Sequence, residues 1–320
     1  MIKYSEEKKE KMTAEKPSEG MIVRGTIIKG IAGFYYVDTG SAVYECKARG
    51  VFKNTSVKPY VGDEVRIDIS SDTPVIREIC ERQNVFERPP VANVEQFVFV
   101  SALKSPDPNF AVVDRFLTAA EKMDVDVVIC FNKADLAGEE IRRSALSTYG
   151  DVYPLVFSDA CSGQGVEQLR PYLKDRKSAL AGTSGVGKST ILNRLIRDAG
   201  AETGSISEKT NRGRHTTRHV ELFRLEGGGM IFDTPGFMSF DLPVMEETEL
   251  PYLFREFGRY EGECRFHGCL HRDEPGCAVK EAAAQGEIPK SRYQSYLMQL
   301  KELGSREKKE QWYRSDRRNR

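Results

Sequence analysis

A glycine-rich segment near the middle of the chain limits the possible folds more than any other feature of the sequence. It fits the pattern GxxxxGK(S/T) and lies between the apolar stretch SALA and the helical run TILNRLI. In this setting, backbone N–H groups wrap phosphates, Lys188 reaches the terminal phosphates and the Ser189 hydroxyl ligates Mg²⁺. We therefore expect a nucleoside triphosphate site on an α/β domain. Its residues are Gly182, Thr183, Ser184, Gly185, Val186, Gly187, Lys188, Ser189 and Thr190.

A second motif indicates which base is bound. The tetrapeptide of Asn132, Lys133, Ala134 and Asp135 follows the apolar run VDVVIC. The Asp135 carboxylate can accept hydrogen bonds from guanine N1–H and N2–H, and adenine lacks that pair of donors. We expect Asn132 to hold the loop and contact the other edge of the base, and the Lys133 stem to lie along the ring. Alone, the tetrapeptide is an ordinary turn, but beside a phosphate loop it favours guanine over an ATPase or kinase site.

A third motif, MIFDTPG, supplies groups for the metal ion and the terminal phosphate. Asp233 is expected at the end of a strand, where it can hold Mg²⁺ through water, and the Gly236 N–H can sense the γ-phosphate. Residues 209–219 form a polar segment before this motif, and its hydroxyl pair, Thr216 and Thr217, offers a Mg²⁺-ligating switch threonine. A solvated loop without that role is the alternative.

The residue that orients the attacking water in many GTPases is missing from its usual place. Phe237 follows Gly236, where those enzymes carry a glutamine. We therefore expect slow unaided hydrolysis that needs a partner or another side chain. His215 is the nearest candidate for a catalytic role in the sequence, and ordinary polar surface is its alternative interpretation.

The order of these motifs is permuted. The base-reading tetrapeptide at 132 precedes the phosphate loop at 182, whereas ordinary GTPases begin with the phosphate loop. Because domain termini usually lie close together at the surface, one sheet can be opened at another point without loss of the site. The switch segment then ends the nucleotide domain and leads directly into the C-terminal region.

Four metal-ligating residues cluster in that C-terminal region. Cys264, Cys269, His271 and Cys277 provide three thiolates and one imidazole within 14 residues, as a closed tetrahedral zinc site requires. His267 is a competing ligand. We expect one structural Zn²⁺ per chain, which supplies folding free energy to a small module.

These observations predict a multidomain α/β architecture. Short β-rich runs broken by Gly, Pro and Asn precede the motifs and are typical of a small five-stranded barrel of the OB-fold type. Apolar strands then alternate with helical patterns, which is typical of a parallel sheet with flanking helices. We assign a polar tail to 1–20, an OB-fold barrel to 21–82, a linker to 83–94, a circularly permuted P-loop GTPase domain to 95–244, and a helical zinc-binding module with a basic tail to 245–320.

Composition says little about partners. The 48 basic and 48 acidic residues cancel, so only local clusters can indicate an acidic partner. Two such clusters are 209–219 and the tail 301–320, and each either binds RNA or is solvated. In the barrel, side chains that either bind nucleic acid or simply pack are Tyr35, Tyr36, Arg49 and Lys53. No apolar run approaches the roughly 20 residues of a membrane span, so we expect a cytoplasmic monomer without a membrane partner.

Taken in order, NKAD, GTSGVGKST, GRHTT, DTPGF and the Cys/His cluster resemble the RsgA family of GTPases that depend on the small ribosomal subunit. The resemblance covers nearly the whole chain. It departs at Asp159-Ala160-Cys-Ser-Gly-Gln-Gly, where the family tends to have Ser-Ala ahead of Gly-x-Gly. The Ala160 N–H can still be offered to guanine O6.

The resemblance implies an enzyme that converts GTP and water to GDP and phosphate, with Mg²⁺, late in maturation of the 30S subunit. The subunit would stimulate hydrolysis, and the OB-fold and zinc module would bind 16S rRNA. Two alternatives remain at this point. One is an RNA-binding assembly factor that uses GTP only as a binding switch, and the other is a P-loop GTPase with a non-ribosomal partner.

Overall fold

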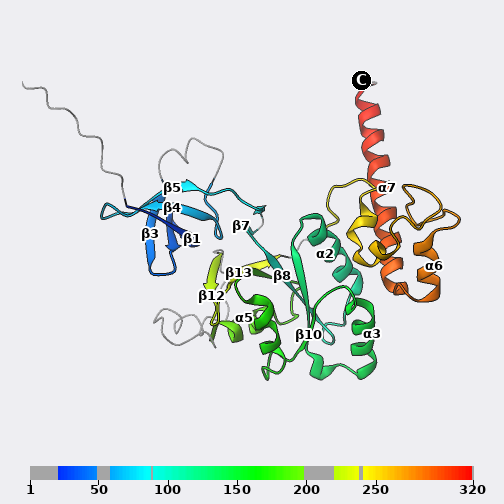
Figure 1. The fold of residues 1–320 in the computed structure, drawn as a ribbon, viewed down its shortest axis with the longest axis horizontal. Coiled ribbons are helices and arrows are strands. Elements are labelled where there is room, and N and C mark those ends of the chain that lie inside the picture. The colour runs from blue at the N-terminus through cyan, green and yellow to red at the C-terminus, as the bar shows by residue number, and fades with distance from the viewer. Residues whose placement is uncertain (1–20, 49–57, 88, 198–219, 238–240, 319–320) are drawn as a thin grey trace, which may run out of the picture.

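The fold is seen in a computed structural model that describes residues 21–48, 58–87, 89–197, 220–237 and 241–318. Three parts follow one another along the chain and lie in a row (Figure 1). A β-barrel lies at one side, a parallel sheet with helices lies in the middle, and a helical module lies at the other side. None of the described helices is long and apolar enough to cross a membrane.

The N-terminal part is a closed barrel of five strands, as the sequence predicts. Its first strand pairs with both the second and the fourth, which closes the ring. Alternate residues point inward, so that Ile27, Val37 and Ile67 are completely buried. The strands are β1 (Ile22–Ile31), β2 (Phe34–Asp38), β3 (Val43–Ala48), β4 (Glu64–Asp68) and β5 (Val75–Ile79).

A short hairpin joins the barrel to the central domain. The segment expected as a linker, 83–94, contains β6 (Val85–Glu87) and β7 (Pro90–Ala92). The Ala92 N–H donates to the Val61 carbonyl at 2.9 Å, and Asn93 donates to the Gly62 carbonyl at 3.1 Å. Gly62 has φ +96°, and a Cβ there would lie 2.1 Å from the Ala92 oxygen, so only glycine allows this close approach.

The central domain is a six-stranded sheet with helices on both faces. The strand order is β10-β9-β8-β11-β13-β12, and all neighbours are parallel except β12 and β13. Every residue of β8 is buried, as expected for a parallel strand covered on both sides. The strands are β8 (Gln96–Ala102), β9 (Asp126–Asn132), β10 (Leu155–Ser158), β11 (Lys177–Ala181), β12 (Glu221–Arg224) and β13 (Met230–Phe237).

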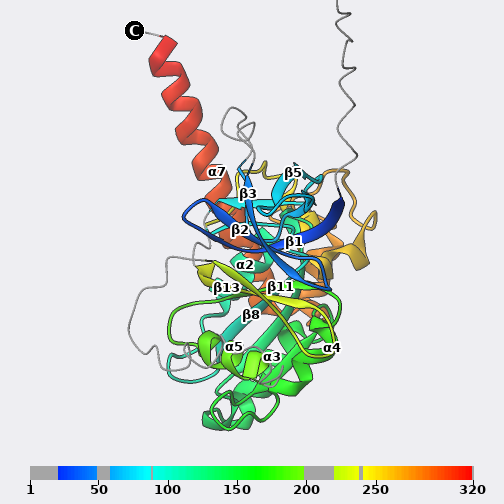
Figure 2. The same cartoon turned by 90° about the vertical axis from the view of Figure 1, so that its left-hand side faces the viewer.

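Each face of this sheet carries an apolar core of its own. Alternate residues of β8 and β9 pack against α2 (Phe110–Lys122) and α3 (Glu139–Tyr149) on one face, and the intervening residues pack against α4 (Arg170–Leu173) and α5 (Lys188–Arg197) on the other. The barrel continues the sheet at its β12 edge, where β1 pairs with β12, and Figure 2 shows the barrel strands beside β13. The first core therefore extends from the barrel into the central domain.

The C-terminal module has a core of its own. The rings of Phe254 and Phe257 stack at 5.3 Å, Tyr296 meets both edge to face at 5.3 and 4.9 Å, and Leu300 is completely buried in the same core. The apolar side of the last helix is therefore a packing surface. The elements are η3 (Leu250–Leu253), η4 (Arg255–Tyr260), α6 (Ala278–Gln285) and α7 (Lys290–Arg318), and η3 and α7 lie on α2 (Figure 1).

A buried ion network joins this module to the central domain. The Arg292 side chain is 1% exposed, and its guanidinium donates to Asp114 at 2.7 Å and to Glu256 at 2.6 Å. Tyr149 donates to the same Asp114 carboxylate at 2.9 Å. Burial raises the pKa of Asp114 even though Arg292 opposes that shift. The network ties α7 and η4 to α2 and α3, and Arg292 is its centre because both buried carboxylates pair with it.

We expect Arg292→Ala to lower the free energy of unfolding by about 3–5 kcal/mol, because two buried carboxylates lose their counter-ion. Urea unfolding followed by circular dichroism measures the change. The matched control is Arg66→Ala, since Arg66 is 60% exposed and pairs with an equally exposed Glu78. That variant should stay within about 0.5 kcal/mol of the parent. An Arg292→Ala protein as stable as this control would contradict the assigned role of the network.

Candidate functional site

The phosphate loop connects β11 to α5, as the sequence predicts. Gly182, Gly185 and Gly187 have φ values of +136°, +79° and +101°, which turn successive N–H groups toward the space above the helix. A Cβ on Gly182 would lie 2.1 Å from the Val100 carbonyl oxygen. The loop therefore needs glycine for its curvature and for close packing on the sheet. Val186 is buried, whereas its exposed members are Ser184, Gly185, Ser189 and Thr190.

Lys188 occupies the centre of this loop. Its ammonium donates to the carbonyls of Gly182 and Thr183 at 2.7 and 2.6 Å. Burial lowers the pKa of Lys188, because the cation has lost water without gaining an anion. A phosphate in the loop would supply that anion. Ser189 is exposed at the first turn of α5, which agrees with its expected role as a magnesium ligand.

Asn132 links the loops around the base site. It is the last residue of β9 and is 2% exposed. Its Nδ2 donates to the Val186 carbonyl at 2.8 Å, and its Oδ1 accepts from Ser158 Oγ at 3.1 Å and from the Ala160 N–H at 3.0 Å. An amide nitrogen has two hydrogens, so one remains for the edge of a base. Ser158 could not be recognised from the sequence as a residue of this site, since a serine at a strand end has no distinctive pattern.

The next residues of the tetrapeptide also face the phosphate loop. Lys133 adopts the left-handed conformation, with φ 58°, and its ammonium donates to the Gly185 carbonyl at 2.9 Å. Its stem thereby spans from the base site to the phosphate loop. Ala134 is buried under this turn, and Asp135 is exposed in η1 (Ala134–Leu136). The carboxylate of Asp135 is thus accessible to a base.

The segment after β10 closes into a tight loop. Asp159 Oδ1 accepts from the Cys161 N–H at 2.8 Å, and Oδ2 accepts from the Ser162 N–H at 3.2 Å. A hydrogen bond from the Ser162 side chain is the main cause that lowers the pKa of Asp159, and these two backbone bonds add to it. The aspartate that departs from the family pattern therefore stabilises the turn itself. Ala160 is 2% exposed, and its N–H, expected to meet guanine O6, is directed to Asn132.

All three loops lie at the carboxyl edge of the sheet, where ligands of open α/β folds bind. β13 brings the third motif to the same edge, because Phe237 is in register with Ala181 of β11. The expectation that Asp233 ends a strand is wrong in detail. β13 continues through Gly236 to Phe237, and Asp233 lies within it, opposite Glu221. The candidates His215, Thr216 and Thr217 lie outside the described residues.

The four predicted metal ligands converge in the C-terminal module. Their ligand atoms all lie within 4.8 Å of one another, and His267 is not part of the group. Cys264 Sγ lies 3.5 Å from His271 Nδ1 and 3.9 Å from Cys277 Sγ, and His271 Nδ1 lies 3.3 Å from Cys277 Sγ. Zinc with bonds of about 2.0–2.3 Å to nitrogen and sulfur gives tetrahedral edges of roughly 3.5–3.8 Å. The donor set therefore fits zinc.

Local hydrogen bonds orient two of these ligands. Cys277 caps α6, because its sulfur accepts from the Lys280 N–H at 3.4 Å. Tyr293 donates to the His271 carbonyl at 2.7 Å, which ties the metal loop to α7. Burial, together with neighbouring thiols, raises the pKa of Cys269 to about 12. Zn²⁺ would counter that shift by stabilising the thiolates.

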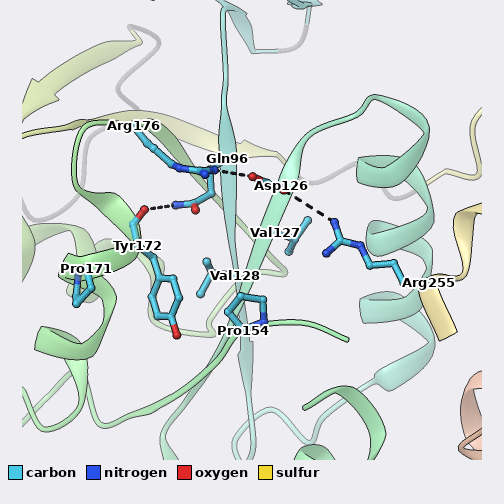
Figure 3. A pocket seen from close by; sticks show the side chains of 9 residues that line it. All are labelled: Gln96, Asp126, Val127, Val128, Pro154, Pro171, Tyr172, Arg176 and Arg255. Carbon is cyan, nitrogen blue, oxygen red and sulfur yellow. Dashed lines mark hydrogen bonds and ion pairs between the residues drawn. The ribbon is translucent and has the colours of Figure 1, made fainter. Parts of the chain in front are cut away.

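A cavity of about 250 Å³ opens at the opposite edge of the sheet, near the amino ends of β8 and β9 (Figure 3). Its polar groups pair with one another. Arg176 bonds Asp126 at 2.6 Å, Gln96 donates to the Tyr172 carbonyl at 3.1 Å, and Arg255 lies 4.0 Å from Asp126. The cavity is thus separate from the loops that would hold a nucleotide.

A phosphate loop at the carboxyl edge of a parallel sheet, with base-reading loops that precede it in the sequence, defines a circularly permuted P-loop GTPase. The RsgA GTPase family model matches residues 79–243, and the RsgA N-terminal domain model matches residues 24–75. The chain belongs to the RsgA GTPase family, and its activity is hydrolysis of GTP.

Named relatives resemble the chain over almost its full length. It is 45% identical to proteins called small ribosomal subunit biogenesis GTPase RsgA from Clostridium perfringens strain 13 and from Carboxydothermus hydrogenoformans, over 89% of this chain and 99% of each relative. The crystal structure of YjeQ from Thermotoga maritima superposes with a TM-score of 0.76 at 35% identity, over 88% of this chain and 99% of that chain. The crystal structure of YloQ, described as a circularly permuted GTPase, gives 0.77 at 34% identity, over 92% and 99%.

Proposed function

We propose that this GTPase acts in late maturation of the 30S ribosomal subunit, and that the subunit stimulates its hydrolysis of GTP. The names of the relatives support this role. The observation that carries the nucleotide assignment is the Asn132 side chain, which bonds both the phosphate loop and the Ala160 loop. The Asn132 side chain thus couples the loop that would read the base to the loop that would bind the phosphates.

Within that site, we assign the base to Asn132, Lys133 and Asp135, and the phosphates to the 182–190 segment. Lys188 would exchange its two carbonyl contacts for phosphate oxygens, and Ser189 would ligate the Mg²⁺ that accompanies GTP. Asp233 and the Gly236 N–H would complete the γ-phosphate side. Zinc at the cysteine cluster would be structural, because four protein ligands leave no open position for catalysis.

We also propose that the barrel and the zinc module bind 16S rRNA. Each carries aromatic rings that are at least partly exposed and lie beside cations, a combination that stacks bases and attracts phosphates. In the barrel, Lys29 lies 5.9 Å from the Tyr36 ring and Lys47 lies 5.3 Å from the Phe34 ring. The Tyr36 hydroxyl is bonded to Glu45, so its ring is held in place. Arg49 and Lys53 lie outside the described residues.

In the zinc module, the equivalent feature is a loop between two metal ligands. Phe266 is 46% exposed, and the Arg265 guanidinium lies 5.5 Å from its ring. Phe266 lies two residues after Cys264 in the sequence, so metal binding would restrain the position of its ring. A rigid exposed aromatic is suited to stacking on an unpaired base.

The proposal predicts that added 30S subunits accelerate GTP hydrolysis, whereas 50S subunits and 70S ribosomes do so less. Phosphate release under multiple turnover measures this. Lys188→Ala is the control, because it removes the cation that meets the phosphates, and stimulation should disappear in it. Tight GTP binding without stimulation by any particle would refute the ribosomal role. Stoichiometric binding to 30S without turnover would instead favour a GTP-dependent switch, for which Phe237 in the glutamine position is the supporting observation.

A further inference from the structure

Arg194 connects the phosphate-loop helix to the loop that follows β10. It lies on α5, six residues after Lys188, and its side chain is half-buried. Its Nε donates to the Ala160 carbonyl at 2.9 Å, and its Nη2 donates to the Cys161 carbonyl. The planar guanidinium thereby holds two successive carbonyls with one rigid fork.

The loop is shaped around this guanidinium. Gly163 has φ +93°, and a Cβ there would lie 2.6 Å from Arg194 Nη1, so a side chain at this position would displace the arginine. Asp159, whose carboxylate closes the same loop, also feels the Arg194 charge, since Arg194 helps to lower the pKa of Asp159. The loop and the arginine therefore form one unit, built from segments 30 residues apart in the sequence.

The position of Ala160 depends on this unit. Its carbonyl faces Arg194 and its N–H faces Asn132, so the residue is held from both sides. That N–H donates to Asn132 Oδ1 at 3.0 Å here, so guanine O6 would have to share it with Asn132 or replace Asn132 as its acceptor, whereas the 6-amino group of adenine would meet it as one donor against another. Loss of the bond from Arg194 to the Ala160 carbonyl would let the Ala160 N–H move away from the base.

We propose that Arg194 is a positioning residue for guanine recognition, which holds the Ala160 N–H where it pairs with O6 and rejects adenine. The inference rests on the proposed nucleotide site. Because α5 begins at Lys188, the same helix then positions both the cation for the phosphates and the donor for the base.

Dissociation constants of GDP, IDP and ADP, obtained by competition with a ribose-labelled fluorescent GDP, test this role. Arg194→Ala should weaken GDP and IDP about tenfold each, since both carry O6 and one hydrogen bond is lost. ADP should change by less than about twofold, so the ratio of GDP to ADP affinity falls about tenfold. Arg194→Lys should recover part of that ratio, because an ammonium reaches one carbonyl but not both. Asn193→Ala, exposed on the same helix, should change none of the three.

Two results would overturn the proposal. One is an unchanged affinity of Arg194→Ala for GDP, and the other is an equal loss of GDP and ADP, which would mark a purely structural role in the phosphate-loop helix. Should Arg194→Ala fail to fold, Arg194→Lys decides: a ratio of GDP to ADP affinity equal to the parent overturns the role, and a reduced ratio supports it. A parent protein that does not prefer GDP to ADP would instead refute the nucleotide site itself, whatever the Arg194 variants do.

Discussion

Asp135→Asn is expected to change the base preference of the site from guanine to xanthine. The exposed Asp135 carboxylate lies at the turn that follows Asn132, where it can accept from both N1–H and N2–H of guanine. Hydrogen bonds to a charged group contribute about 1.5–3 kcal/mol each, so losing both weakens GDP by roughly 10²–10⁴-fold. Xanthine carries an oxygen in place of the 2-amino group, and an amide N–H can donate to it.

Competition of GDP and XDP against a fluorescent nucleotide measures both changes in one series. The matched control is Asp151→Asn, which alters an exposed carboxyl in the turn after α3 and should leave both affinities within about twofold. If Asp135→Asn lost GDP without gaining XDP, the side chain would stabilise the turn but would not read the base. Full retention of GDP affinity would remove Asp135 from the base site altogether.

Loss of the metal is expected to unfold the C-terminal module. Binding of structural zinc contributes about 10–16 kcal/mol to the folding of small zinc domains, more than the stability of most whole domains. Here Cys277 is a predicted ligand and also part of the apolar core, together with Phe257 and Tyr296. Cys277→Ser should therefore expose this core to protease, and a strong chelator should do the same to the parent protein.

Limited proteolysis followed by mass spectrometry detects where the chain is cut. In Cys277→Ser, the zinc content measured by atomic spectroscopy should fall from one ion per chain to none. Cuts are expected beyond residue 245, while the nucleotide domain stays intact, because its cores on the two faces of the sheet are separate from that of the module. Cys161→Ser, which alters an exposed thiol outside the cluster, is the control. Cys277→Ser protein with full zinc and an unchanged digestion pattern would contradict the assignment.

Much of the site was predictable because its chemistry depends on residues close together in the sequence. A phosphate loop needs its glycines and its lysine at fixed spacing, and it forms wherever a strand precedes it and a helix follows. The Asn132–Asp135 tetrapeptide and the four zinc ligands are local in the same sense. The permuted order of the motifs is also visible in the sequence itself. The comparisons confirm the GTPase class and the architecture that follow from it.

The sequence was a poor guide to secondary structure where hydrogen bonds between distant segments lengthen a strand or create a new one. Asp233 was expected at a strand end, but register with β11 carries β13 on to Phe237. The hairpin inside the expected linker 83–94 could not be recognised in the sequence, because β6 and β7 are only three residues each and such short strands have no periodicity. Their pairing, and the contact of Ala92 with Val61, arise only when the barrel docks.

The sequence by itself determined the order of the motifs along the chain and predicts which groups do the chemistry, because phosphate loop, base reader and metal ligands each belong to one short segment. Only the tertiary structure decided how those segments hold one another. The bonds of Asn132 to two other loops, of Arg194 to the Ala160 loop and of Arg292 to Asp114 join residues 28 to 178 positions apart. An arginine or asparagine has no local pattern that names its partner, because the partner depends on how the strands and helices pack.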